Sequence, residues 1–262
     1  MDPVYTTDVC RFSCPLQWGL TVFWREDMPP DDWLPVLSTA LEPDGIRVLG
    51  HRHESSTVSQ FMLSTLPQVS PSTIVQRVKG RLQYCVRDQR PKALRGNFAL
   101  RSVGNETRAV VERYVAKQVE HHPMADPRVV ARLERLQIAI PEVDLREPQR
   151  TSQGLFWYNL HLVLVHRDRW MDINEESLQA ICSMILRASA AKCYLLSRGG
   201  ILPDHLHLTL GCPFEVAPID VALGFLNNLA YVHGMKPVYQ YGGFIGTFGE
   251  YDNRAVKSDS RP

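Results

Sequence analysis

The stretch that decides the fold begins with LFWYNLHLVLVH, residues 155–166. It continues through EESLQAICSMILRASA (175–190), KCYLLSRGGIL (192–202), HLHLTLGC (205–212) and APIDVALGFLNNLAYV (217–232). The first, third and fourth segments are aliphatic or alternate between apolar and polar positions, which is typical of strands. The second and fifth repeat apolar residues at helical spacing. The stretch therefore predicts the element order βαββα.

The first half of the chain repeats this order. Strands are expected at 16–24, 45–50 and 59–66, and helices at 31–41 and 72–86. The two copies align at their ends, where ALRSVGN (99–105) matches FIGTFGE (244–250) and Gly104 pairs with Gly249, an offset of 145 residues. A recurring order and spacing indicate duplication. We therefore predict an α+β protein of two ferredoxin-like (RRM-like) units with antiparallel sheets, arranged as a pseudo-dimer.

A proline-rich segment separates the two copies. Residues 121–150 contain prolines at 123, 127, 141 and 148 around one short amphipathic helix at 129–137, which is typical of a structured linker. The predicted organisation is a first half at 1–120, the linker at 121–150 and a second half at 151–262.

Composition excludes several classes of protein. The 262 residues are 44% hydrophobic and 22% charged, with no apolar run of the length that spans a membrane. The amino terminus lacks the features of a signal peptide. The six cysteines are scattered, and a chain of this size needs no disulfides to form a core. These features predict a cytoplasmic protein with reduced thiols and no membrane partner.

Charge is distributed unevenly along the chain. The net charge is only +1, yet residues 74–118 hold eleven Lys and Arg against three acidic residues, a local +8. A local basic field attracts phosphate, so Arg77, Lys79 and Arg81 are candidate contacts to DNA. A solvated helix face explains the same charges equally well.

Two short motifs carry candidate chemistry. In ILPDHLHLTL (201–210), His205 and His207 alternate with leucines and share one face of a strand, where two imidazoles can bind one divalent cation. Two histidines on an exposed sheet face are the alternative. In RSVGNETRAVVERYVAKQ (101–118), Tyr114 and Gln118 are spaced i, i+4 and share a helix face. A half-buried helix aromatic is the alternative for Tyr114.

These motifs together resemble the HUH single-tyrosine transposases of insertion sequences and their REP-associated relatives. The resemblance implies that His205, His207 and Gln118 bind Mg²⁺ or Mn²⁺. It also implies that Tyr114 attacks a DNA phosphate and forms a 5′-phosphotyrosine. The expected function is a DNA nicking and joining enzyme of the bacterial cytosol or nucleoid, acting on single-stranded DNA with or without hairpin ends.

The sequence departs from that family in both halves. Val58 and Gln60 stand where the first half should carry its histidines, and Asp259 stands where the second half should carry its tyrosine. We interpret His51 and His53 as part of a surface loop or strand end. Each half keeps what the other lacks, so we expect one composite site within a monomer that mimics the family's dimer.

Two alternatives to an enzyme remain. One is a catalytically inactive, transposase-derived DNA-binding protein that uses the sheets and the basic segment. The other, less favoured, is an RNA-binding module, since ferredoxin-like sheets also bind RNA.

Overall fold

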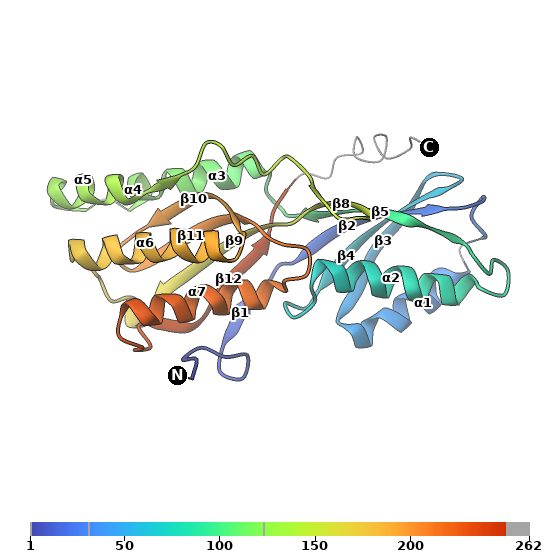
Figure 1. The fold of residues 1–262 in the computed structure, drawn as a ribbon, viewed down its shortest axis with the longest axis horizontal. Helices are drawn as coiled ribbons and strands as arrows, with labels where there is room; N and C mark the ends of the chain where they lie inside the picture. The colour runs from blue at the N-terminus through green and yellow to red at the C-terminus, as the bar shows by residue number, and fades with distance from the viewer. Residues whose placement is uncertain (1, 31, 123, 250–262) are drawn as a thin grey trace.

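A computed structural model describes residues 2–30, 32–122 and 124–249. The described chain forms two six-stranded sheets, which lie side by side along the long axis of the molecule (Figure 1). Sheet A contains, in spatial order, β1 (Arg11–Ser13), β12 (Tyr239–Thr247), β9 (Asn159–His166), β11 (His205–Gly211), β10 (Leu195–Ile201) and β6 (Ile138–Ala139). Sheet B contains β3 (Ile46–Ser55), β4 (Val58–Thr65), β2 (Gln17–Trp24), β5 (Leu94–Val103), β8 (Gly154–Trp157) and β7 (Gln149–Arg150). The predicted α+β class with two ferredoxin-like units is confirmed.

The first unit is built on sheet B. Alternation along β2 sends Trp18, Leu20 and Val22 into the core, where all three are fully buried. Helices α1 (Trp33–Leu41) and α2 (Pro71–Val86) cover this face (Figure 1). Helix α2 begins where Ser70 accepts a hydrogen bond from the Thr73 amide, a standard N-cap.

The second unit is built on sheet A. Helices α6 (Glu175–Ala191) and α7 (Pro218–Val232) pack together and against β9, β10 and β12. Asn174 caps α6 by accepting from the Ser177 amide. Every residue of β11 is buried, as expected of a strand that is covered on both faces.

The two units exchange strands, which the sequence did not predict. The apolar run 155–166 divides at Tyr158: β8 pairs parallel with β5 in sheet B, while β9 joins sheet A. In return, β1 pairs parallel with β12 in sheet A. Tyr158 is fully buried at the division, with its ring centroid 5.3 Å from that of Trp18. The sheets are therefore mixed, with one parallel pair in each, instead of wholly antiparallel as expected.

A reciprocal pair of hydrogen bonds joins the ends of the two units. The Thr247 hydroxyl donates to the carbonyl of Val103 over 2.6 Å, and the Ser102 hydroxyl donates to the carbonyl of Phe248 over 2.9 Å. Ser102 and Thr247 are separated by the same 145 residues as Gly104 and Gly249. Equivalent residues thus contact each other as in a two-fold dimer interface, here within one chain.

Three helices lead from the first unit across sheet A. They are α3 (Arg108–Ala116), α4 (Gln118–His121) and α5 (Pro127–Leu136), and they lie in a row in Figure 1. Helix α5 corresponds to the helix expected in the linker. Short 3₁₀ turns, η1 (Glu42–Asp44) and η2 (Arg167–Arg169), complete the described elements. Within the described ranges, no helix is both long and apolar enough to cross a membrane.

Candidate functional site

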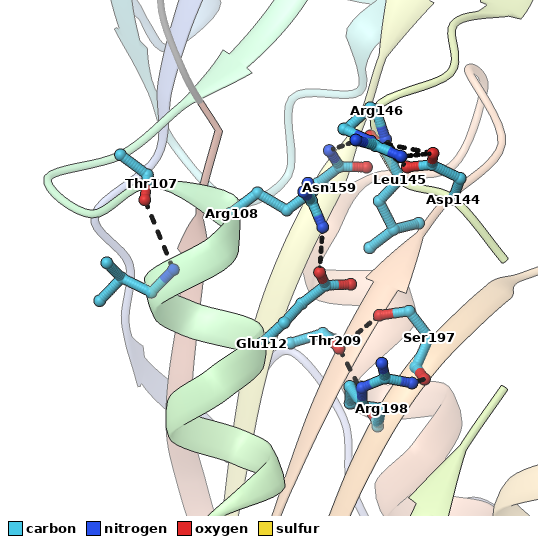
Figure 2. Close-up of polar contacts among 11 residues, drawn as sticks. Thr107, Arg108, Glu112, Asp144, Leu145, Arg146, Asn159, Ser197, Arg198 and Thr209 are labelled. Carbon is cyan, nitrogen blue, oxygen red and sulfur yellow. Dashed lines mark hydrogen bonds and ion pairs between the residues drawn. The ribbon is translucent and has the colours of Figure 1, made fainter. Parts of the chain in front are cut away.

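Helix α3 crosses sheet A on the face opposite α6 and α7, and Figure 2 shows two polar contacts within the helix. Thr107 caps the helix by accepting from the Val110 amide, and Arg108 pairs with Glu112 one turn along. Both charged side chains of that pair are largely shielded from solvent, with 22% and 13% exposed. Helix α3 lies over β10 and β11.

The sheet beneath α3 carries its own polar contacts. The side chain of Asn159 donates to the carbonyl of Leu145, and the hydroxyls of Ser197 and Thr209 share a 2.7 Å hydrogen bond (Figure 2). Beside them, Arg146 forms a forked ion pair with Asp144 and lowers the pKa of that carboxyl to about 2. These contacts order the part of sheet A that lies beneath α3.

Four imidazoles gather on this face of sheet A: His122, His161, His205 and His207, here called the histidine cluster. His161 Nε2 lies 3.0 Å from His207 Nδ1, a hydrogen bond between neighbouring strands. Ring centroids are 5.1 Å apart for His205 and His207, and 4.9 Å apart for His122 and His205. The alternation of β11 directs both of its histidines to this face and Leu206 and Leu208 to the core, as the period-two pattern predicts.

The structure brings Tyr114 and Gln118 to this cluster. The Tyr114 ring centroid lies 5.6 Å from that of His207 and 6.4 Å from that of His161, and 44% of the tyrosine is exposed. Gln118 is fully buried, and its Nε2 donates to the Tyr114 carbonyl over 3.1 Å. Its Oε1 is also buried and accepts no hydrogen bond from any described residue. The four residues singled out in the sequence are thus neighbours in space.

Burial keeps His161, His205 and His207 uncharged at neutral pH. Loss of solvent lowers the pKa of His161 to about 4 and that of His207 to about 2, with the neighbouring imidazoles adding to the effect at His207. Burial also lowers the pKa of His205, although Asp204 opposes the shift. His205 Nδ1 lies 2.6 Å from the Asp204 carboxylate, and that carboxylate also pairs with Arg169. A neutral imidazole has a lone pair available to a cation.

Sequence reasoning did not single out His161, His122 or Asp204. A signal for His161 was present, because it occupies an outward position in the alternating strand 159–166. His122 follows the short helix α4, and its place beside His205 depends on the crossing of that helix over sheet A. Asp204 precedes the histidine pair directly and could have been named as its support.

The three candidate DNA contacts lie on α2, in the other unit. Arg81 pairs with Asp44 over 2.7 Å and Arg77 lies 3.7 Å from the same carboxylate. Lys79 donates to the carbonyls of Arg95, Gly96 and Asn97 at the start of β5. These side chains thus make intramolecular contacts, and their role toward DNA stays a prediction, as does the single-stranded DNA partner itself.

Val58 and Gln60 stand where the first half lacks a histidine pair, and Asp259 stands where the second half lacks a tyrosine. Val58 and Gln60 lie on β4, and the buried Gln60 accepts hydrogen bonds from the Arg52 guanidinium. Asp259 lies outside the described residues.

Comparisons with known proteins find matches among solved structures alone. No model of a known protein family matches, and no curated protein matches. One similar solved structure carries the provisional assignment of glycine cleavage system transcriptional repressor. It is 8% identical, with a TM-score of 0.23, and the match covers 90% of this chain and 98% of the other. A second is an unknown protein from Galdieria sulphuraria, 10% identical with a TM-score of 0.23, covering 84% of this chain and 94% of the other.

These findings correct the expected family and activity. No family model matches the chain, that of the HUH transposases included. Nor do the described residues contain a group of three or more His, Cys, Asp or Glu side chains arranged to hold a metal ion. The assignment as a DNA nicking and joining enzyme is therefore wrong, as is the transposase-derived alternative. The resemblance depended on two short motifs, and strands and helices of ordinary proteins also contain them.

Proposed function

We propose that this protein binds a divalent transition-metal ion at the histidine cluster. The observation that carries the proposal is that three neutral imidazoles, those of His161, His205 and His207, lie side by side on one face of sheet A, although their nitrogens do not already point at a common centre. Neutral imidazole is the commonest protein ligand for such ions. The conclusion concerns binding alone and assigns no reaction.

The surroundings of the imidazoles support a ligand role. Asp204 holds Nδ1 of His205 and leaves Nε2 as the ring nitrogen available to a metal ion, an arrangement that typically orients a metal-binding histidine. The buried Gln118 Oε1, which has no partner among the described residues, supplies a neutral oxygen donor on the adjoining helix. Binding would give this atom the partner that a buried oxygen otherwise lacks.

Binding requires a small rearrangement of the cluster. His161 Nε2 and His207 Nδ1 are 3.0 Å apart and point at each other through a hydrogen bond. Two nitrogen ligands at 2.0–2.1 Å from a tetrahedral ion stand roughly 3.3 Å apart. The two rings must therefore rotate so that both lone pairs meet at one point, while the distance between the nitrogens changes little.

The donor set favours some metals over others. Imidazole suits Zn²⁺, Ni²⁺, Co²⁺ and Cu²⁺, whereas Mg²⁺ and Mn²⁺ prefer carboxylate, carbonyl and water oxygens. The Mg²⁺ or Mn²⁺ suggested by the sequence would find only the Gln118 oxygen in this set. We therefore propose that Zn²⁺ and Co²⁺ bind at this site more tightly than Mg²⁺ and Mn²⁺. All of these ions belong in one comparative titration.

The test is a titration of the metal-stripped full-length protein with Co²⁺, followed by its visible absorption, and with Zn²⁺, followed by calorimetry. Wild-type protein should develop the absorption of nitrogen-bound Co²⁺. His161→Ala and His207→Ala should each weaken binding at least about 10-fold, and Asp204→Asn about 10–100-fold. His233→Ala, at the end of α7 and outside the cluster, is the matched control and should bind normally. Unchanged affinity in both cluster variants, with an unchanged melting temperature, contradicts the proposal.

We also propose a cytoplasmic location. All six cysteines are free thiols in the structure, as expected of a compartment that keeps thiols reduced. Labelling of all six cysteines in freshly lysed, unreduced cells tests this, and a disulfide between any two of them contradicts it.

A further inference from the structure

A second group of soft metal ligands lies in the other unit, at the edge of sheet B. His51 and His53 occupy alternate positions of β3 and therefore share a face of the strand. Their ring centroids are 4.7 Å apart, with the rings edge to face. Met28, in the loop between β2 and α1, brings its Sδ to 3.0 Å from His53 Nδ1. His53 thus lies between a second imidazole, that of His51, and the thioether of Met28.

The thioether of Met28 is held in place, unlike most methionine side chains, which are flexible. The Met28 amide donates to the carbonyl of Ser56 over 2.9 Å. The Ser59 hydroxyl donates to Sδ over 2.8 Å and itself accepts a 2.9 Å hydrogen bond from the indole of Trp24. Two prolines follow Met28 and stiffen the loop. The sulfur is therefore presented at a fixed position beside His53.

The site is open to solvent. A surface pocket of about 560 Å³ is lined by Met28 and His53 together with Asp27, Pro29, Pro30, Ser55 and Ser56. His53 is exposed and Met28 half-buried, so an ion can reach both side chains without unfolding of the sheet. Rotation of the exposed His53 ring allows the separation of sulfur and nitrogen to widen around an ion.

We propose that Met28, His51 and His53 form a binding site for Cu(I). Thioether sulfur is a soft ligand that selects Cu(I), and imidazole accepts the same ion, whereas hard cations avoid sulfur. Sequence reasoning interpreted His51 and His53 as a surface loop or strand end because a histidine pair with arginine between carries little signal. The third ligand, Met28, is 23 residues from His51 and 25 from His53 in sequence, and only the packing of its loop against β3 reveals it.

The test is a competition between the full-length protein and a Cu(I)-specific chromogenic chelator under anaerobic conditions. Met28→Leu keeps the side-chain volume and removes the sulfur, and His53→Ala removes an exposed ring. Each should weaken Cu(I) binding at least about 10-fold, by comparison with the effect of losing metal-site residues. X-ray absorption of the Cu(I) complex should show a sulfur neighbour that disappears in Met28→Leu.

Two controls separate this site from others. Met62→Leu alters a half-buried methionine on the opposite face of the neighbouring strand β4 and should leave Cu(I) binding unchanged. His207→Ala should also leave it unchanged, because the histidine cluster is in the other unit. The proposal is overturned if wild-type protein fails to compete with the chelator, or if Met28→Leu binds Cu(I) as tightly as wild type.

Discussion

Gly200 sets how closely α3 and α4 approach sheet A. It lies opposite His207 in the β10–β11 pair, directly under the crossing helices. A Cβ added here would stand 2.9 Å from Cγ of Gln118 and 3.1 Å from the carbonyl of Val115. Real side chains do not pack at such distances, so the helices would have to move away. Because Gly200 has no side chain, Gln118 can approach the sheet beside the strand that carries His207.

We expect Gly200→Ala to lower the free energy of unfolding by about 1–3 kcal/mol, the usual penalty for overpacking. Urea unfolding followed by circular dichroism measures the change. Gly224→Ala is the control, because its added Cβ has nothing within 4 Å and it lies within helix α7, where alanine is favoured. That variant should be neutral or more stable by up to about 1 kcal/mol. Equal effects in the two variants would contradict this account.

The buried histidines also predict how stability depends on pH. The pKa of His161 is lowered to about 4 in the folded protein, against about 6.5 when unfolded. Between these values the unfolded chain binds more protons, so the free energy of unfolding falls as the pH drops from 7 toward 4. Each such group contributes at most about 1.4 kcal/mol per pH unit.

Urea midpoints measured between pH 7 and pH 4 should therefore fall steadily, and His161→Gln should fall less steeply because it removes one titrating group. The pKa of His207, lowered to about 2, contributes over the same range. The Asp144 carboxyl, with its pKa near 2, loses its contribution only below about pH 4. A midpoint independent of pH from 7 to 5 is incompatible with neutral buried imidazoles.

At the scale of elements, Lys79 joins α2 to the first residues of β5 through hydrogen bonds. Its ammonium donates to three consecutive carbonyls, those of Arg95, Gly96 and Asn97. These carbonyls lie where β5 begins and face the helix instead of a neighbouring strand. A charged donor shared by three backbone oxygens explains a lysine on a half-buried helix face without any external ligand.

Lys79→Met keeps the length of the side chain and removes the donor. We expect it to lower the free energy of unfolding by about 1–3 kcal/mol, because the carbonyls lose a charged partner. Lys92→Met, at an exposed position nearby, should stay within about 0.5 kcal/mol of wild type. Chemical denaturation of the two variants under the same conditions decides the matter. A neutral Lys79→Met would show that water replaces the ammonium.

At the scale of the whole molecule, the two units behave as one body. Most of their buried hydrophobic residues form one continuous cluster, which includes Trp18 and Leu20 from the first unit and Leu206 and Leu208 from the second. Strand exchange through β1 and β8, and the reciprocal bonds of Ser102 and Thr247, tie the units together. Neither unit keeps a complete sheet without the other.

Thermal unfolding should therefore show a single calorimetric transition, with equal calorimetric and van't Hoff enthalpies. Thr247→Val removes the buried hydroxyl that donates to the Val103 carbonyl. We expect it to lower the free energy of unfolding by about 1–3 kcal/mol and to shift the single transition as a whole to lower temperature. Thr39→Val, at an exposed position of α1, is the control. Two separate transitions, or a shift confined to part of the melting curve, would contradict the single-body description.

The sequence by itself determined the βαββα order of each unit and its duplication. Period-two and helical repeats are local properties, so the βαββα order, the alternation of His205 with Leu206 and the equivalence of Gly104 with Gly249 could be read directly. The single helix expected to carry Tyr114 and Gln118 is interrupted, because α3 ends at Ala116 and Gln118 is the first residue of α4. The tertiary structure decided what surrounds these residues. The division at Tyr158, the approach of α4 over Gly200, and the meetings of His161 with His207 and of Met28 with His53 all join segments distant in sequence. Such contacts depend on how buried surfaces fit together, and short motifs carry no record of that fit.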